Sequence, residues 1–279
     1  MLRSQFTESL TMKKVIITAV AVAFITSIGY AATEPAATNQ RPAIIHLDPP
    51  EQNFFSKELT FRGIPIKSHE VVSNEALYAA YDRLALLLGH LPDMVISNLV
   101  GNKVELHIIG RDQVTTDLPE WLHDKGKPIE EYHGLTRDQR TRGMGGRLTS
   151  CGEENLLKLD KDRYHGRDIC LHEFAHAIRN YGIDQDLREK FNTQYRASLD
   201  KGRWVNSYAG SNSDEYFAEL TMWYFGTHGD LSMTGPKPEN GTEGLKKYDP
   251  EAFQLFDDFY QGRLPVKPYH RSFRPHEDD

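Results

Sequence analysis

The residues best placed to do chemistry are two histidines and a glutamate within five consecutive positions. Residues 172–176 read His-Glu-Phe-Ala-His, which is the H-E-x-x-H pattern. Positions four apart on a helix share one face, so His172 and His176 can both reach one Zn²⁺. Glu173 projects beside them, where it can take a proton from a metal-bound water. The pattern therefore predicts a zinc site with Glu173 as general base; the alternative is a surface helix carrying two solvated histidines.

A catalytic zinc ion takes three protein ligands and leaves one position open for water. Residues 177–186 contain no histidine, and the next one along the chain is His228. A second predicted helix at 213–225 offers Glu215 and Glu219, four positions apart on one face. One of them could bind the metal while the other orients a histidine ligand. Spacing alone leaves open which glutamate does which, and also leaves open a solvated face that binds nothing.

The chain has two cysteines, Cys151 and Cys170. Cys170 lies two positions before His172, on a different face of the predicted helix, so the thiolates do not fit the same zinc site. In an oxidising compartment the pair would form one disulfide, which would tie the segment at Cys151 to the start of the zinc helix. Two buried free thiols are the alternative.

The elements that must position these residues can be read from apolar spacing and capping residues. Asp168 can cap a helix that carries the histidines and runs to Tyr181. The stretch at 116–147 is polar and is expected to be mostly loop, although Gly143–Gly146 would let the backbone pass close to a neighbour, such as an extended peptide. Further helices are expected at 75–88, 186–199, 213–225 and 250–260, and strands at 59–66 and 103–109. This pattern predicts an α+β fold with a small mixed sheet in the first half and a mostly helical second half.

The N-terminal residues carry the pattern of an export signal. Residues 15–30 are uncharged and mostly apolar, follow Lys13-Lys14 and precede two alanines. A membrane span needs about 20 apolar residues, so an uncleaved anchor is the weaker interpretation. We expect a signal peptide at 1–31 and a proline-bearing extended leader at 32–55. The product would be secreted, periplasmic or on the cell surface, without stable membrane insertion, and translation could begin at Met1 or at Met12.

The segment downstream of HEFAH resembles a known family. Residues 207–219, SYAGSNSDEYFAE, resemble the zinc-binding core of the anthrax lethal factor family of metalloproteases. The resemblance begins at the histidine pair and does not include the other domains of that toxin. It implies that Glu215 is the third zinc ligand, that Tyr208 donates a hydrogen bond to the oxyanion of the transition state, and that Glu219 supports a ligand without binding metal.

The whole mature chain, after the expected signal peptide, is also similar to a group of secreted zincin-like proteins of bacteria and fungi. The two resemblances imply one zincin-like catalytic domain at 56–279, and neither identifies a substrate. The stretches that carry the second resemblance are TTDLPEW at 115–121, CGEENLL at 151–157, DRYHGRDICLHEFAHAI at 162–178 and LKKYDPE at 245–251.

Motif and resemblance together imply a secreted zinc-dependent metallopeptidase, with one Zn²⁺ per chain and a peptide or protein as its substrate. Glu173 would pass the proton of the attacking water to the leaving amine. A zinc hydrolase of a non-peptide amide would use the same residues. A catalytically silent, zinc-stabilised surface-binding protein is the third reading, but such a protein would have no use for Glu173 or Tyr208.

Composition excludes several classes of protein. The 279 residues include 33 Lys+Arg against 40 Asp+Glu, for a formal net charge of −7, and 39% are hydrophobic. These values exclude a membrane bundle, a collagen-like chain and a wholly disordered chain. Nucleic-acid binding favours a dense positive surface, and this slightly acidic balance of charged residues does not predict one. We therefore do not expect the chain to bind nucleic acid.

Overall fold

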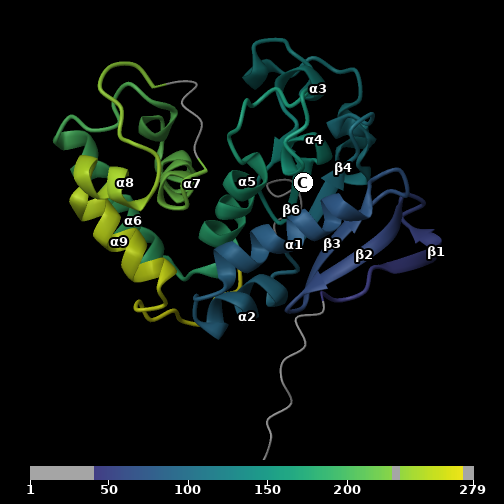
Figure 1. The fold of residues 1–279 in the computed structure, drawn as a ribbon, viewed down its shortest axis with the longest axis horizontal. Helices are drawn as coiled ribbons and strands as arrows, with labels where there is room; N and C mark the ends of the chain where they lie inside the picture. Colours follow the sequence, from purple (N-terminus) through teal and green to yellow (C-terminus); the bar gives the residue numbers. More distant parts are fainter. Residues whose placement is uncertain (1–40, 228–232, 273–279) are drawn as a thin grey trace, which may run out of the picture. The chain divides into compact units, whose positions relative to one another are not determined.

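A computed structural model describes residues 41–227 and 233–272 of the chain (Figure 1). The signal peptide expected at 1–31 lies outside these residues, and so does His228. The leader expected at 32–55 is described only in its second part. There, Ile45–Glu51 forms a strand, β1, that pairs with the next strand of the chain.

The first half of the described chain builds a six-stranded mixed sheet in the order β1-β2-β3-β4-β6-β5. The strand expected at 59–66 is a hairpin, because Arg62 and Gly63 adopt positive φ and turn the chain between β2 and β3. β4 is parallel to both of its neighbours, and β5 is a short antiparallel strand at the edge. The strands after β1 are β2 (Phe55–Phe61), β3 (Ile64–Ser68), β4 (Glu105–Ile109), β5 (Gly143–Met144) and β6 (Leu148–Gly152).

Two helices separate β3 from β4. The helix α1 (Asn74–Leu88), expected at 75–88, begins where the side chain of Ser73 accepts a hydrogen bond from the Ala76 amide. Its apolar face packs on β2, β3 and α5. The helix α2 (Asp93–Gly101) follows Pro92, which is compatible with a helix start because it lacks an amide hydrogen.

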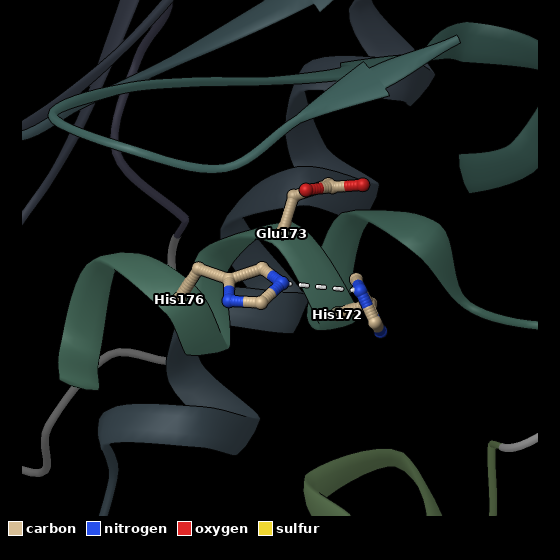
Figure 2. A group of neighbouring side chains, drawn as sticks. All are labelled: His172, Glu173 and His176. Carbon is tan, nitrogen blue, oxygen red and sulfur yellow. Dashed lines mark hydrogen bonds between the residues drawn. The ribbon is translucent and has the colours of Figure 1, made fainter. Parts of the chain in front are cut away.

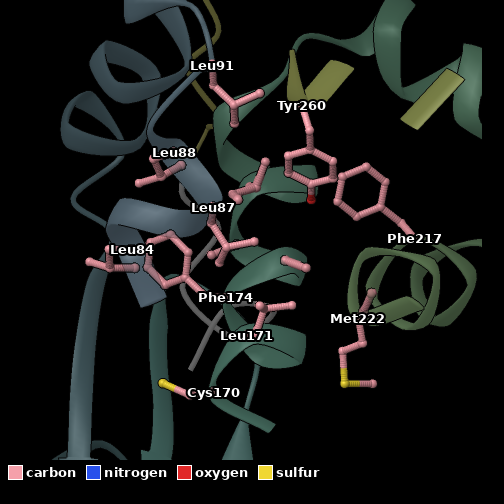
Figure 3. Close-up of a cluster of buried hydrophobic side chains, with 14 of the residues drawn as sticks. Leu84, Leu87, Leu88, Leu91, Cys170, Leu171, Phe174, Phe217, Met222 and Tyr260 are labelled. Atoms are coloured by element: carbon pink, nitrogen blue, oxygen red, sulfur yellow. The ribbon is translucent and has the colours of Figure 1, made fainter. Parts of the chain in front are cut away.

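The second half is mostly helical. The histidine helix α5 (Ile169–Ala177) lies between the sheet and α7 and contacts both (Figure 1). Leu171 and Phe174 of α5 are buried beside α1, and Phe217 and Met222 of α7 are buried in the same core (Figure 3). The remaining helices are α3 (Arg137–Arg140), α4 (Glu153–Leu156), α6 (Gln185–Asp200), α7 (Ser213–Tyr224), α8 (Thr242–Tyr248) and α9 (Pro250–Tyr260).

This architecture confirms the α+β class, with its small mixed sheet first and its helices later. Cys151 on β6 and Cys170 on α5 form a disulfide, as expected for an oxidising compartment. The stretch at 116–147, expected to be mostly loop, also holds short helical turns and the edge strand β5. Within the described ranges, no helix has the length and apolar character needed to cross a bilayer.

Candidate metal centre

The start of α5 is held by side chains from outside the helix. Asp168 accepts a hydrogen bond from the amide of Leu171 at 3.0 Å, and Asn155 accepts one from the amide of Ile169 at 2.8 Å. These bonds satisfy amides that lack partners within the helix. The apolar side of α5 is buried in the core. The rings of His172 and His176 approach each other across one helical turn, and the carboxylate of Glu173 projects from the helix in a different direction (Figure 2).

These three residues could hold a metal ion, because their ligand atoms lie within 4.8 Å of one another. The Nε2 atoms of His172 and His176 are 3.2 Å apart. Oε2 of Glu215, on α7, lies 3.1 Å from the first nitrogen and 3.5 Å from the second. Two ligands at about 2.0–2.1 Å from a tetrahedral zinc ion are about 3.3–3.4 Å apart. The three donor atoms of His172, His176 and Glu215 therefore match one face of a zinc tetrahedron.

The electrostatics of the donor set also suit a cation. Oε2 of Glu215 is buried and has no hydrogen-bond partner among the described residues. Burial opposes ionisation of Glu215, but the adjacent His172 and His176 hold the pKa of this carboxyl well below its usual range. Burial also lowers the pKa of His172, whereas Glu215 and Glu219 outweigh that effect and raise it to about 10. The site thus favours positive charge where the ligand atoms meet.

Glu219 approaches the same imidazole from the other side. Its Oε1 lies 3.2 Å from Nδ1 of His172, and it forms an ion pair with Arg167. Glu219 is almost fully buried. Because Nδ1 faces away from the three donor atoms, Glu219 is placed to orient His172 rather than to join them.

Glu173 sits under the backbone of the glycine-rich segment. A Cβ added to Gly145 would lie 2.8 Å from Cβ of His176 and 3.1 Å from Oε2 of Glu173. A Cβ added to Gly143 would lie 2.6 Å from Ile169 Cγ2. The close approach of this segment to α5 therefore requires glycine at both positions. Burial raises the pKa of Glu173, and the two histidines partly offset that rise.

Tyr208 lies on a one-turn 3₁₀ helix (Tyr208–Gly210) just before α7. Its hydroxyl donates a hydrogen bond to Oε1 of Glu215 at 2.9 Å. Burial, and then the charge of Glu215, raises the pKa of Tyr208 above its ordinary value. The phenol is therefore a hydrogen-bond donor throughout the neutral range, beside the oxygen that Glu215 shares with the histidines.

These groups line a cleft of about 370 Å³. The edge strand β5, the glycines after it and Tyr208 all contribute to its lining. Among the described residues, its lining includes Tyr132, Arg140, Met144, Gly145, Asn180 and Asp214 as well as the candidate ligands and Glu173.

Residues that support the cleft were not assigned from the sequence. Arg142, just before β5, donates two hydrogen bonds of 2.7 Å to Glu154. Asn155 binds the carbonyl of Arg167 at 2.7 Å as well as the first amide of α5. Glu154 and Asn155 belong to the CGEENLL stretch, so the sequence did mark this stretch. Their partners Arg142 and Arg167 lie in loops, which helical spacing cannot locate.

Comparison with known proteins adds little to this geometry. No family model and no curated protein matches the chain. Among solved structures, the chain is similar to the Pro-Pro endopeptidase PPEP-2 from Paenibacillus alvei, with 18% identity over 67% of this chain and 90% of that chain and a TM-score of 0.35. At this level the likeness says nothing about what the present chain binds or cleaves.

Proposed function

We propose that this chain is a zinc-dependent metallopeptidase of the kind that uses glutamate as its third ligand, as the resemblance to the lethal factor family implies. The proposal depends above all on one observation. Donor atoms of His172, His176 and Glu215, from two separate helices, lie 3.1–3.5 Å from one another beside a cleft. Two imidazoles and one carboxylate are a common ligand set of catalytic zinc.

The chemistry divides among the residues of the cleft. When bound, zinc lowers the pKa of a water molecule to about 7 and polarises a carbonyl group. Glu173 accepts the proton of the attacking water and returns it to the leaving amine. Its burial beneath Gly145 favours this role because it brings the carboxyl pKa closer to neutrality. The hydroxyl of Tyr208 donates to the oxygen of the scissile carbonyl as negative charge develops there.

The form of the cleft favours a peptide over a small amide. β5 pairs with β6 on one side and is the edge strand of the sheet. Its Gly143 and Met144 also line the cleft. An edge strand can bind an extended peptide through main-chain hydrogen bonds. The disulfide is compatible with the export expected from the N-terminal signal.

The decisive test is Glu173→Gln in the zinc-loaded protein. This change keeps the side-chain shape but removes the base, so we expect zinc to be retained and peptide hydrolysis to fall by about 10²–10⁴-fold. Zinc content would be measured by metal analysis, and turnover on a mixture of denatured proteins and random peptides by mass spectrometry.

Glu189→Gln, an exposed glutamate on α6, serves as the matched control and should leave turnover unchanged. Treatment with a chelator should abolish hydrolysis, and added zinc should restore it. Unchanged hydrolysis in Glu173→Gln would contradict the mechanism. Turnover of acylated small amides without any peptide cleavage would instead identify a hydrolase of another class.

A further inference from the structure

Arg140 differs from the other arginines near the cleft because its side chain is not committed to a partner. It ends α3, is exposed and lines the cleft that holds Glu173 and Tyr208. In the described ranges its guanidinium makes no hydrogen bond or ion pair, and its nearest ring contact is with Tyr132, 6.0 Å from the centroid. By contrast, Arg137 binds Asp124 at 3.0 Å and also packs over an aromatic ring.

The backbone that carries Arg140 is firmly held. Thr136 caps α3 by accepting a hydrogen bond from the amide of Gln139. Asp138 accepts hydrogen bonds from the amide and the hydroxyl of Thr116, at 2.9 Å and 2.7 Å. The base of the Arg140 side chain is therefore fixed before any ligand arrives, which limits the entropy lost on binding.

The other charges of the cleft already have partners or roles. Glu173 and Glu215 face the metal centre, and Asp214 pairs with Arg179 at 2.5 Å. Arg140 lines the same cleft as Glu173 and Tyr208, so its positive charge lies on the side of the molecule where the reaction would take place. One uncompensated cation thus faces the space that a substrate would fill.

We propose that Arg140 is a specificity-determining residue that selects peptides with an acidic side chain, Asp or Glu, close to the scissile bond. A guanidinium presents paired donors that match a carboxylate, and charge-assisted hydrogen bonds of this kind are the stronger ones. This inference rests on the proposed peptidase function and adds the substrate class. The exposed position of Arg140 predicts a preference of up to about fivefold, which weakens as salt is added.

The test uses the zinc-loaded full chain and a peptide library in which one position is Glu or Gln and the rest are random. We expect kcat/KM for the Glu peptides to exceed that for the matched Gln peptides by up to about fivefold. Arg140→Gln should bring the ratio of kcat/KM for Glu and Gln peptides close to one. Arg140→Glu should shift the preference to Lys. Arg196→Gln, exposed on α6 outside the cleft, is the control and should keep the wild-type ratio.

Retention of the same Glu and Gln peptides on immobilised Glu173→Gln separates this proposal from the proposed function. If the wild type cleaves peptides but the Glu/Gln ratio is near one, or survives in Arg140→Gln, the role of Arg140 is refuted and the peptidase stands. If no peptide is cleaved, the peptidase is refuted. In that case binding still tests Arg140. If Glu173→Gln retains Glu peptides better than Gln peptides, and the double variant Glu173→Gln/Arg140→Gln does not, the role of Arg140 is supported. If Glu173→Gln retains both kinds of peptide equally, that role is refuted.

Discussion

Glu215 and Glu219, one helical turn apart on α7, are given different roles by the single imidazole they share. Oε2 of Glu215 lies 3.1 Å from Nε2 of His172, and Oε1 of Glu219 lies 3.2 Å from Nδ1 of the same ring. Arg167 pairs with Glu219 and balances its charge. Glu215 has a buried oxygen without a hydrogen bond in the described chain, so it is the one left for a metal.

The two glutamine variants should separate these roles at the level of zinc affinity. Removing a carboxylate that orients a histidine ligand typically costs about 10–100-fold in metal affinity, so we expect a loss of this size in Glu219→Gln. Glu215→Gln removes a charged ligand and should lose more. Competition with a fluorescent chelator would measure both. The reverse order of losses would assign the third ligand to Glu219.

At the scale of elements, the site depends on how closely the segment after β5 approaches α5. Gly145→Ala would place a methyl group 2.8–2.9 Å from His176 and 3.1 Å from the Glu173 carboxylate. Because the methyl is attached to backbone, either the segment or these side chains must move. We expect peptide hydrolysis and zinc affinity to fall at least tenfold, since a misplacement of about 1 Å can cost about a hundredfold in rate. Steady-state kinetics and metal competition would measure the two losses.

Gly101→Ala is the matched control for this substitution. Gly101 ends α2, and a Cβ there would have no atom within 4 Å. Circular dichroism should show that both variants keep the wild-type helix content. Full activity in Gly145→Ala would mean that the segment can yield without cost, contrary to the packing described above.

The sequence predicts those helices whose apolar spacing and capping residues lie within or next to the helix itself. α1, α7 and α9 follow from apolar spacing and a capping residue next to the helix, and the histidine pair follows from helical spacing. β6 and α4 could not be predicted in this way, because they depend on distant partners such as β4 and the Arg142–Glu154 pair. The prolines of β1 favoured the interpretation as an extended leader, but β1 is an edge strand, and edge strands tolerate proline. Arg140 lies in a four-residue helix that gives no periodic signal.

At the scale of the whole described unit, buried carboxylates connect segments far apart in sequence. Asp249, fully buried at the start of α9, accepts hydrogen bonds from Trp204 at 2.9 Å and from Ser198 at 2.6 Å. Glu153, fully buried at the start of α4, accepts hydrogen bonds from the amide of Ser73 at 3.1 Å and from the side chain of Arg111 at 2.6 Å. For Glu153, contacts of this kind lower the carboxyl pKa, so the ionised form stabilises the fold more than the protonated form does.

The stability of the chain should therefore depend on pH through Glu153. Burial alone would raise the pKa of Glu153, but Arg111 and Ser73 reverse this effect and lower it from 4.5 to about 2. A lowered pKa in the folded state adds stability above about pH 4.5, and that stability is lost as the pH falls toward 2. At 1.36 kcal/mol per pKa unit, the shift corresponds to at most about 3 kcal/mol. We expect Glu153→Gln to be less stable than the wild type by up to this amount at pH 6.

Urea unfolding at pH 6, 4 and 2.5 would measure this difference, which should shrink steadily toward acid because the wild-type carboxyl becomes protonated. Any loss of zinc in acid destabilises the wild type and Glu153→Gln alike, so its effect largely cancels in the difference between their free energies of unfolding. Glu131→Gln, which changes an exposed glutamate, should leave the curve unaltered. A difference that stays constant with pH would show that Glu153 acts through shape and hydrogen bonding alone. A difference that grows toward acid would show that the folded protein binds the proton more tightly than the unfolded chain does, opposite to the direction given by the Arg111 contact.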